Sequence, residues 1–479
     1  MNMKYIIGID GGSQSSKVIV FDLAGNIVCE GRQDLRPMSL PAPGLVEHPD
    51  DDLWDSIVTA ARQAMLRFPG RPEDIIGLGL CTIRFCRVLL KEDGTLAAPA
   101  MSWMDVRVSR PYEHDNPAVR YVTTTSGYIT HRLTGEFCDT AANYQGQWPI
   151  DTDTWQWSED AEVFRQKQIP RNMLFTLQMP GTILGQVSTK ASQLTGIPAG
   201  IPVAATANDK AVEALGAGSL AKNTALVSLG TYIAAMVHGQ ENPKNTQQFW
   251  TNFAAMPGSY LYESYGIRRG MWTISWFKNL LGDDVALKAE VAGLSPEDYL
   301  NREAQHVPPG CHGLMTVLDW LAPVNEPFKR GIIIGFDARH GGSHIYRSLL
   351  EGIALTMKNK ADAMCAELGI DLERIIISGG GSNSSLFMQI FADVFGVPAS
   401  RNVVNGSASL GSAICAAVAV GAYGDYQTAI DKMVRLRDCF LPNREHTDFY
   451  RRMNENVYLR ITTYTDEILK LAHPVFEFR

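Results

Sequence analysis

Residues 5–17 read YIIGIDGGSQSSK, and this stretch decides the fold. An apolar run typical of a β-strand ends at Asp10, two glycines allow a tight turn, and a second β-type run begins at Lys17. A third such run, Ile27–Glu30, follows another turn, so the N-terminus predicts a β-meander. Because a strand rather than a helix follows the glycines, the stretch is neither a Walker loop nor the dinucleotide-binding fingerprint of a dehydrogenase.

The side chains around this first glycine turn are suited to binding a phosphate. Backbone N–H groups freed by such a turn form an anion-binding concavity. Ser13 and Ser15 can donate to phosphate oxygens, and Lys17 supplies a positive charge. Asp10 would repel a phosphate unless a divalent cation lay between them, and Mg²⁺ with retained waters fits that place. A plain hairpin turn is the alternative reading, since short glycine motifs are common.

Two later glycine turns have related chemistry. The strand-like run Ala225–Leu229 enters a turn at Gly230-Thr231, which places a hydroxyl beside a glycine before the next strand. Residues 378–384, SGGGSNS, follow the run Ile375–Ile377 and precede a predicted helix. Close backbone approach and helix N-terminal amides would suit a nucleotide's ribose, base or α-phosphate. A capped connection from strand to helix is the alternative for this third turn.

The length and the restart of the strand–glycine pattern predict two domains. A chain of 479 residues with 45% hydrophobic residues predicts a globular protein with more than one core. The pattern of the N-terminal strands begins again near the middle of the chain. We therefore expect an α/β protein with domains at residues 1–240 and 241–479.

Composition excludes several classes of partner. Lys and Arg number 43 against 51 Asp and Glu, which gives a net charge of −8 without a basic block for nucleic acid. The eight dispersed cysteines contain no CxxC pair and are typical of a reducing compartment. The most apolar stretch, residues 413–422, is too short to cross a bilayer. We expect a cytoplasmic protein with neither nucleic acid nor a membrane as partner.

Five collinear stretches resemble the FGGY carbohydrate kinase family, whose members include glycerol kinase-like and xylulokinase-like proteins. They are IGIDGGSQSSKVIVFD, ANDKAVEALGAG, VSLGT, RGIIIGFDARHGGSHIYRSLLEGIA, and IIISGGGSNSSLFMQIFADVFGVPAS with SASLGSA after it. The resemblance implies two actin-like (ribonuclease H-like) ATPase domains with a cleft between them. It assigns the sugar site, first phosphate loop and general base to residues 1–240, and the adenosine site to residues 241–479.

The resemblance also implies an activity, the ATP-dependent phosphorylation of a hydroxyl on a small sugar or polyol, be it a ketose, a polyol or a sugar acid. Asp209 matches the family's general base, and Asp10 would organise Mg²⁺. A helix N-cap is the alternative for Asp209, and a plain helical glycine is the alternative for Gly270. The candidate ATP-binding residues are Gly12, Ser13, Gln14, Ser15, Lys17, Gly230, Thr231, Gly270, Gly380, Gly381 and Ser384.

Substrate recognition in this family uses two segments. Residues 81–85, CTIRF, supply Arg84, and residues 103–107, WMDVR, supply Trp103 and Asp105. Arg84 can donate to vicinal hydroxyls or to a carboxylate, and Trp103 offers an apolar wall. Their alternatives are a surface ion pair and a core aromatic residue. The chain departs from the family at Phe85, where glycerol kinase-like members carry glutamate, and residues 110–123 are abbreviated, so the substrate is not fixed.

Two competing functions remain beside the kinase. One is a degenerate sugar kinase that binds a sugar or nucleotide as a regulator. The other is an actin-like ATPase without kinase activity, against which the placement of Asp209 and the collinear motifs argue. For the kinase we expect a homodimer with a small sugar or polyol as substrate and ATP and Mg²⁺ as cofactors.

Overall fold

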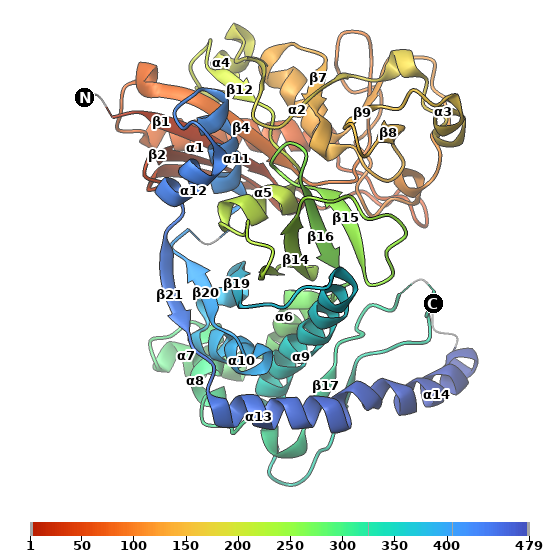
Figure 1. The fold of residues 1–479 in the computed structure, drawn as a ribbon, viewed down its shortest axis with the longest axis vertical. Helices are drawn as coiled ribbons and strands as arrows, with labels where there is room; N and C mark the ends of the chain where they lie inside the picture. The colour runs from red at the N-terminus through yellow and green to blue at the C-terminus, as the bar shows by residue number, and fades with distance from the viewer. Residues whose placement is uncertain (1–2, 324, 405, 477–479) are drawn as a thin grey trace.

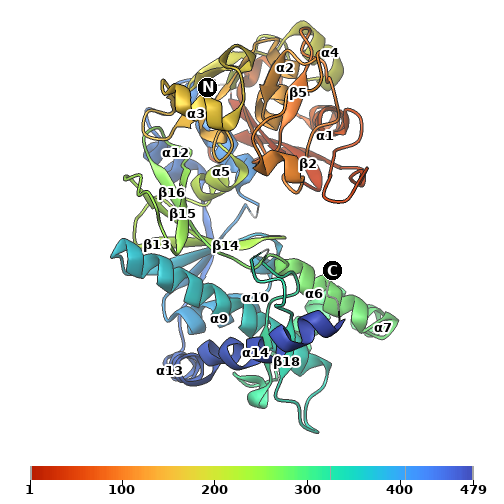
Figure 2. The same cartoon turned by 90° about the vertical axis from the view of Figure 1, so that its right-hand side faces the viewer.

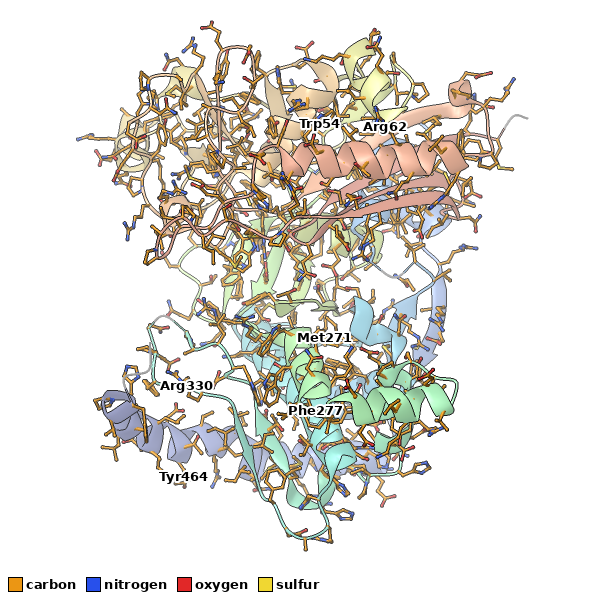
Figure 3. The ribbon with its side chains drawn as sticks, turned by 180° about the vertical axis from the view of Figure 1, so that it is seen from behind. Trp54, Arg62, Met271, Phe277, Arg330 and Tyr464 are labelled. Atoms are coloured by element: carbon orange, nitrogen blue, oxygen red, sulfur yellow. The ribbon has the colours of Figure 1, made fainter. Side chains whose placement is uncertain are left out.

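The computed structural model describes residues 3–323, 325–404 and 406–476. These residues form two lobes, one above the other in Figure 1, and the side view in Figure 2 shows the same division. Each lobe has its own sheet and its own buried side chains. Trp54 is buried in the first lobe and Phe277 in the second (Figure 3). No described helix is both long enough and apolar enough to span a bilayer.

The first lobe is built on a six-stranded sheet. Its strands, in spatial order, are β11 (Ile183–Gln186), β12 (Pro202–Ala204), β4 (Ile75–Thr82), β1 (Tyr5–Gly11), β2 (Ser15–Asp22) and β3 (Ile27–Asp34). The last three strands are antiparallel neighbours, which confirms the predicted N-terminal meander. The strands β4 and β12 run parallel to β1, so their carboxyl ends lie at one edge of the sheet.

Helices cover both faces of this sheet. Side chains alternate between the faces of a strand, and Ile7 and Ile9 pack with α1 (Asp52–Arg67) while Ile6 packs on the opposite side with α11 (Ala408–Ala419). A Cβ atom on Gly8 would lie 2.0 Å from the Ser409 carbonyl oxygen, so α11 can approach the sheet only because Gly8 has no side chain. A late segment of the chain thus covers the first sheet, as the blue helix in the upper lobe of Figure 1 shows.

The second lobe is built on a seven-stranded sheet. Its strands, in spatial order, are β15 (Phe249–Phe253), β16 (Tyr260–Ser264), β14 (Ile233–Gly239), β13 (Thr224–Leu229), β19 (Arg374–Ser378), β20 (Ala399–Asn402) and β21 (Leu436–Phe440). The central strands β13 and β19 are parallel, with Ser228 opposite Ser378. The second and third glycine turns therefore leave the sheet at the same edge.

The other elements complete the two lobes. The helices are α2 (Thr125–Thr134), α3 (Ala161–Lys167), α4 (Thr189–Thr195), α5 (Asp209–Gly216), α6 (Gly270–Leu280), α7 (Asp283–Val291), α8 (Pro296–Ala304), α9 (Gly342–Leu368), α10 (Ser385–Phe395), α12 (Tyr426–Met433), α13 (Arg444–Met453) and α14 (Leu459–Phe476). Short strand pairs are β5 (Val88–Leu90) with β6 (Tyr121–Thr123), β7 (Cys138–Thr140) with β10 (Thr176–Gln178), β8 (Ile150–Asp151) with β9 (Gln156–Trp157), and β17 (Met315–Val317) with β18 (Ile332–Ile334).

The strand β12 belongs to the first sheet and the next strand, β13, to the second. The late helix α11 packs against the first sheet. Neither feature marks residue 240. The division into residues 1–240 and 241–479, with a cleft between them, stays a prediction.

Candidate active site

Three parallel strands bring the chemistry of the first lobe together. Asp10 stands opposite Cys81 in the register of β1 and β4, and Arg84 follows β4 directly. Asp209 follows β12, the neighbour of β4, and begins α5. Because the carboxyl ends of parallel strands share one edge, residues far apart in sequence meet there. This topology places Asp10, Arg84 and Asp209 in one region.

The first glycine turn contacts the second lobe. The Gly12 N–H donates to the Ser15 carbonyl at 3.1 Å and closes the turn between β1 and β2. The Gln14 amide donates to the Thr231 hydroxyl at 3.3 Å, so the first and second turns meet across the lobes. Ser13 is partly exposed, whereas Ser15 is only 8% exposed. Of the two predicted phosphate-binding serines, Ser13 is the more accessible to a ligand.

The second turn is tied to α6 by its carbonyl groups. Gly270 N–H donates to the Thr231 carbonyl at 2.8 Å, and Met271 N–H donates to the Gly230 carbonyl at 3.1 Å. A Cβ on Gly270 would lie 2.4 Å from the Ile233 side chain, so packing within the protein already accounts for this glycine. The phosphate contact predicted for Gly270 therefore stays a prediction, while Gly230 and Thr231 hold the helix start in place.

The third turn lies against the second. Gly379 has φ +84°, and a Cβ there would lie 2.4 Å from the Leu229 carbonyl oxygen. A Cβ on Gly381 would lie 2.7 Å from the Leu229 side chain. In contrast, a Cβ on Gly380 would have nothing within 4 Å. Protein packing thus explains Gly379 and Gly381, but at Gly380 open space leaves room for close approach by a ligand.

Hydrogen bonds of Arg401 and Ser384 fix the third turn and the start of α10. The guanidinium of Arg401 donates to the carbonyls of Ser382 at 2.6 Å and Asn383 at 2.9 Å, and it pairs with Asp438 at 2.7 Å. The Ser384 hydroxyl accepts from Phe387 N–H at 3.1 Å, which caps α10, and lies 2.8 Å from the Asn301 side-chain oxygen. Ser384 therefore has a structural role, and its predicted adenosine contact stays a prediction.

Asp209 combines a helix start with a partly open carboxylate. Asn208 is the N-cap of α5, since its side chain accepts from Ala211 N–H at 3.1 Å. The Asp209 side chain is 29% exposed and accepts from Lys210 N–H at 2.9 Å. Burial raises the pKa of Asp209, and the positive charges of Arg84 and Lys210 offset part of that rise. A carboxylate with a raised pKa and partial access is suited to accept a proton.

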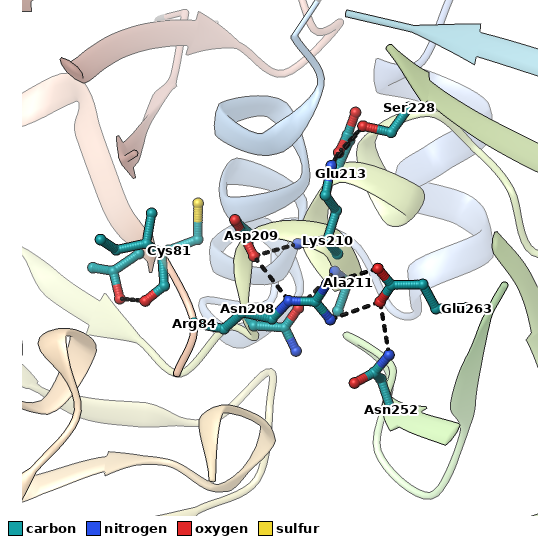
Figure 4. A network of polar contacts seen from close by, with 12 residues as sticks. Cys81, Arg84, Asn208, Asp209, Lys210, Ala211, Glu213, Ser228, Asn252 and Glu263 are labelled. Atoms are coloured by element: carbon teal, nitrogen blue, oxygen red, sulfur yellow. Dashed lines mark hydrogen bonds and ion pairs between the residues drawn. The ribbon is translucent and has the colours of Figure 1, made fainter. Parts of the chain in front are cut away.

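Arg84 joins the two lobes through an ion pair (Figure 4). Its Nη1 and Nη2 atoms donate to the two Glu263 oxygens, each at 2.7 Å, and its Nε lies 3.9 Å from Asp209. Glu263 lies on β16, has no exposed side-chain surface, and also accepts from the Asn252 amide at 2.9 Å. Burial alone would raise the pKa of Glu263, but Arg84 lowers it. The pair is therefore ionised and shared between the lobes.

A second network anchors α5 to the other lobe. Lys210 donates to Glu213 at 3.0 Å and contacts the Ser228 hydroxyl at 2.6 Å. The hydroxyls of Ser228 and Ser378, at the ends of β13 and β19, both donate to Glu213. Burial alone would raise the pKa of Glu213, but Lys210 and these hydroxyls lower it. This network fixes the helix that begins with Asp209 against the strands that lead into the glycine turns.

Phe85 lies beside Arg84, and Cys86 links this segment to Trp103, the predicted wall residue. The Arg84 guanidinium is 5.1 Å from the centre of the Phe85 ring, and Phe85 has φ +64°, a conformation that side chains rarely adopt. The Cys86 thiol contacts the backbone of Trp103, whose side chain is 44% exposed. Asp105 is buried and accepts from Arg107 and from Val46 N–H. It thus holds the turn that presents Trp103, and its predicted substrate contact stays a prediction.

A cavity with aromatic, polar and charged side chains adjoins this part of the second lobe. Trp250 pairs with Glu263 in the register of β15 and β16, so the two side chains share one face of the sheet. Trp250, Tyr232 and Tyr265 line part of a cavity of about 840 Å³. Charged side chains such as Arg268, Asp319 and Lys329 also line this cavity, which Arg84 itself does not line.

The environment of Asp10 fits a divalent cation. Burial raises the pKa of Asp10 to about 6, because Lys17, opposite it in the β1–β2 register, only partly compensates. A buried carboxylate without a close cation gains most from a bound metal ion. The described residues contain no group of three or more His, Cys, Asp or Glu side chains arranged around a metal. An ion here would be one that keeps water and phosphate ligands, which is how Mg²⁺ binds.

Sequence reasoning missed four residues of this site. Glu263, Glu213 and Arg401 each hold a predicted site residue or turn in place, and Asn252 holds Glu263. Two of them carried a signal. Glu263 is a lone carboxylate in the apolar strand run 260–264, and Glu213 follows Asp209 by one helical turn. Asn252 and Arg401 carried none, because neither lies in a motif and their partners are on other elements, β16 for Asn252 and the third turn for Arg401.

Comparisons with known proteins match most of the chain to one family. The chain matches the N-terminal domain model of the FGGY family of carbohydrate kinases over residues 5–117 and 108–216, and the C-terminal domain model over residues 225–420. It is 56% identical over 475 residues to an uncharacterized sugar kinase of Escherichia coli, YgcE, which covers 99% of this chain and 96% of that one.

Solved structures with low sequence identity have the same fold. A gluconate kinase from Lactobacillus acidophilus superposes with a TM-score of 0.82 at 18% identity, covering 97% of this chain and 99% of its own. A ligand-bound xylulose kinase from the same organism superposes with a TM-score of 0.82 at 18% identity, covering 96% and 98%. These matches confirm the predicted class of two actin-like α/β ATPase domains.

Proposed function

The chain belongs to the FGGY family of carbohydrate kinases, and from this we propose that it transfers the γ-phosphoryl group of ATP to a hydroxyl of a small sugar or polyol, with Asp209 as general base. One observation carries the proposal. The carboxylate of Asp209 lies 3.9 Å from Arg84, which is itself held by a residue of the other lobe. We call the three glycine turns with Asp10 the donor side, and Arg84, Trp103, Asp209, Asn252 and Glu263 the acceptor side.

On the donor side, backbone amides and hydroxyls would bind the phosphates of ATP. The first turn offers Gly12, Ser13, Gln14 and Lys17, and the second turn offers Gly230 and Thr231. The open space beside Gly380 supports a role for the third turn at the adenosine. Mg²⁺, when bound beside Asp10, would neutralise charge on the phosphates. The first and second turns are already in contact through Gln14, which supports their acting together.

On the acceptor side, Arg84 would orient the substrate and Trp103 would cover its carbon chain. The Asp209 carboxylate takes the proton from the attacking hydroxyl. The hydroxyl oxygen forms a bond to the γ-phosphorus, the bond between that phosphorus and the β–γ bridging oxygen breaks, and ADP leaves. Phosphoryl transfer needs mainly positioning and charge stabilisation, so a fixed base and a fixed guanidinium are suitable parts.

Asp209→Asn tests the proposal. The asparagine keeps an oxygen for Lys210 N–H but cannot accept the substrate proton, so the kcat should fall by about 10²–10⁴-fold. Thermal melting and MgATP binding by calorimetry should be unchanged, which would show that the loss lies in chemistry. ADP release and phosphorylated product are measured together across a panel of polyols, ketoses and sugar acids.

The outcomes separate the competing functions. Normal turnover by the variant would remove Asp209 from the mechanism. Ligand binding by the wild type without any product would favour a sugar-binding regulator, and ATP hydrolysis independent of sugar would favour an actin-like ATPase. The predicted homodimer stays a prediction, which the mass of the protein in solution tests.

A further inference from the structure

The acceptor side contains more negative than positive charge. Arg84 is the cation nearest to Asp209, and both of its Nη atoms already bind Glu263. The ammonium of Lys210 binds Glu213 and Ser228, and its charge reaches Asp209 and Glu263 without a hydrogen bond to either carboxylate. Two carboxylates, Asp209 and Glu263, therefore face one guanidinium. A third carboxylate brought by a substrate would meet a charge that is already neutralised and would lie beside two like charges.

The hydrogen-bonding groups of the acceptor side also favour a neutral substrate. A guanidinium has five N–H groups, of which two bind Glu263, and the described residues give the other three no hydrogen-bond partner. A substrate hydroxyl can accept from Arg84 and at the same time donate to Asp209. A substrate carboxylate in that same place can only accept, so it could not bridge Arg84 to Asp209 as a hydroxyl does. The arrangement is thus complementary to neutral hydroxyl groups.

Glu263 is in a position to impose this charge balance. It is fully buried, it is held by Asn252, and its bidentate geometry fixes the plane of the guanidinium. Because Glu263 belongs to the second lobe and Arg84 to the first, the charge of the acceptor side is set where the lobes meet. Phe85 and Trp103, at 38% and 44% exposure, add apolar surface for a carbon chain and no charge.

We propose that the acceptor is a neutral polyol or ketose and that Glu263 is the residue that discriminates against sugar acids. This inference rests on the proposed kinase function. Glu263 discriminates by neutralising Arg84 rather than by touching the reacting hydroxyl. It is therefore a positioning and specificity-determining residue.

The test compares neutral and acidic compounds of equal carbon number. Xylitol, xylulose and xylonate form one set, and sorbitol, fructose and gluconate form another. For the wild type, the best neutral compound should exceed the matching acid in kcat/KM by at least about 100-fold, because placing like charges together is strongly unfavourable. Calorimetry with a non-hydrolysable ATP analogue should give the same order of affinity.

Glu263→Gln identifies the cause. This variant keeps the shape but removes one of the two carboxylates that face Arg84, so the neutral-to-acid ratio should fall by at least about tenfold. Glu263→Asp keeps the charge and should keep the ratio even where turnover falls. The matched control is Glu351→Gln on α9, which breaks another buried Arg–Glu pair, with Arg347 at 2.8 Å, and should leave the ratio unchanged.

Each outcome decides the proposal. A wild type that prefers an aldonate overturns this inference and leaves the proposed kinase function standing. If neither Glu263→Gln nor Glu351→Gln changes the neutral-to-acid ratio, Glu263 does not determine the specificity. If Glu263→Gln does not fold, the wild-type ratio and Glu263→Asp still decide. Absence of both turnover and binding for every compound overturns the proposed function, and this inference with it.

Discussion

On the donor side, each binding element is a short turn of consecutive residues, whereas on the acceptor side the essential contact joins Arg84 to Glu263, 179 positions away. The donor turns owe their shape to local backbone geometry, as at Gly379 with φ +84°. The acceptor side owes its shape to side chains that meet only after both sheets have formed. The comparison teaches that ATP binding and sugar recognition can be perturbed separately, and that the second should be more sensitive to contacts between the lobes.

The strongest test of this separation is Arg84→Met. Removing the guanidinium should lower kcat/KM for the sugar by at least about 10²-fold, because the acceptor loses its orienting group. It should also lower the free energy of unfolding by about 3–5 kcal/mol, because Glu263 is left buried and unpaired. Calorimetry should find the MgATP affinity unchanged.

The double variant Arg84→Met with Glu263→Met is the control for that loss. Replacing both charges by apolar groups should restore most of the stability but none of the turnover. Urea unfolding measures the first and ADP release the second. If Arg84→Met alone is as stable as the wild type, the buried ion pair is contradicted. If its loss of MgATP affinity equals its loss of sugar affinity, the distinction between the donor and acceptor sides is removed.

The donor side should respond to pH through Asp10. Its pKa is raised to about 6 in the protein, so the carboxylate becomes protonated as the pH falls through that value. MgATP affinity should then decrease by about tenfold for each further pH unit, since only the ionised form attracts the cation. Calorimetric titrations between pH 5 and pH 8 measure the effect, and Asp10→Asn should bind weakly with no such dependence. A wild-type affinity that is constant down to pH 5 would exclude Asp10 from the metal site.

Two neighbouring glycines separate ligand contact from packing on the donor side. Gly380→Ala places a methyl group in open space, so it should leave stability unchanged and weaken MgATP binding by about 5- to 10-fold through contact with the nucleotide. Gly379→Ala is the matched variant. It should lower the free energy of unfolding by at least about 1–2 kcal/mol, because of its positive φ and the Leu229 carbonyl. Equal MgATP affinities for Gly380→Ala and wild type would place the nucleotide elsewhere.

The smallest effect is expected at Gln14, where the two lobes touch on the donor side through an exposed hydrogen bond to Thr231. Gln14→Ala should weaken MgATP binding by only about 2- to 5-fold, the value of one ordinary hydrogen bond. The sugar KM at saturating MgATP should not change. A larger change in the sugar KM than in the MgATP affinity would mean that this contact controls how the lobes meet.

The sequence predicted those parts of the molecule that depend on local geometry. The N-terminal meander and the three glycine turns could be located because strand runs and glycines are visible in a short window. The position of Asp209 at a helix start was visible for the same reason. The fold class followed from the resemblance, which depends on the order of these local motifs.

The remaining parts depend on distant partners and could not be predicted. Nothing near Glu263 in the chain indicates that β16 ends opposite the loop that carries Arg84. Gly270 and Ser384 were predicted as ligand-binding residues because of their positions in the motifs. The structure gives Gly270 a packing role and Ser384 a capping role. Only the three-dimensional contacts separate a glycine needed by the protein from one that leaves space for a ligand.

The close approach of α11 to Gly8 has a consequence for biosynthesis. Residues 409–417 of this helix are buried, and they cover the face of the first sheet that includes Ile6. While the ribosome is still translating the middle of the message, that face of the nascent chain has no cover. Until the segment emerges from the exit tunnel, this apolar face is a surface that chaperones can bind. The earliest strands to be synthesised therefore gain the cover of α1 early and that of α11 late.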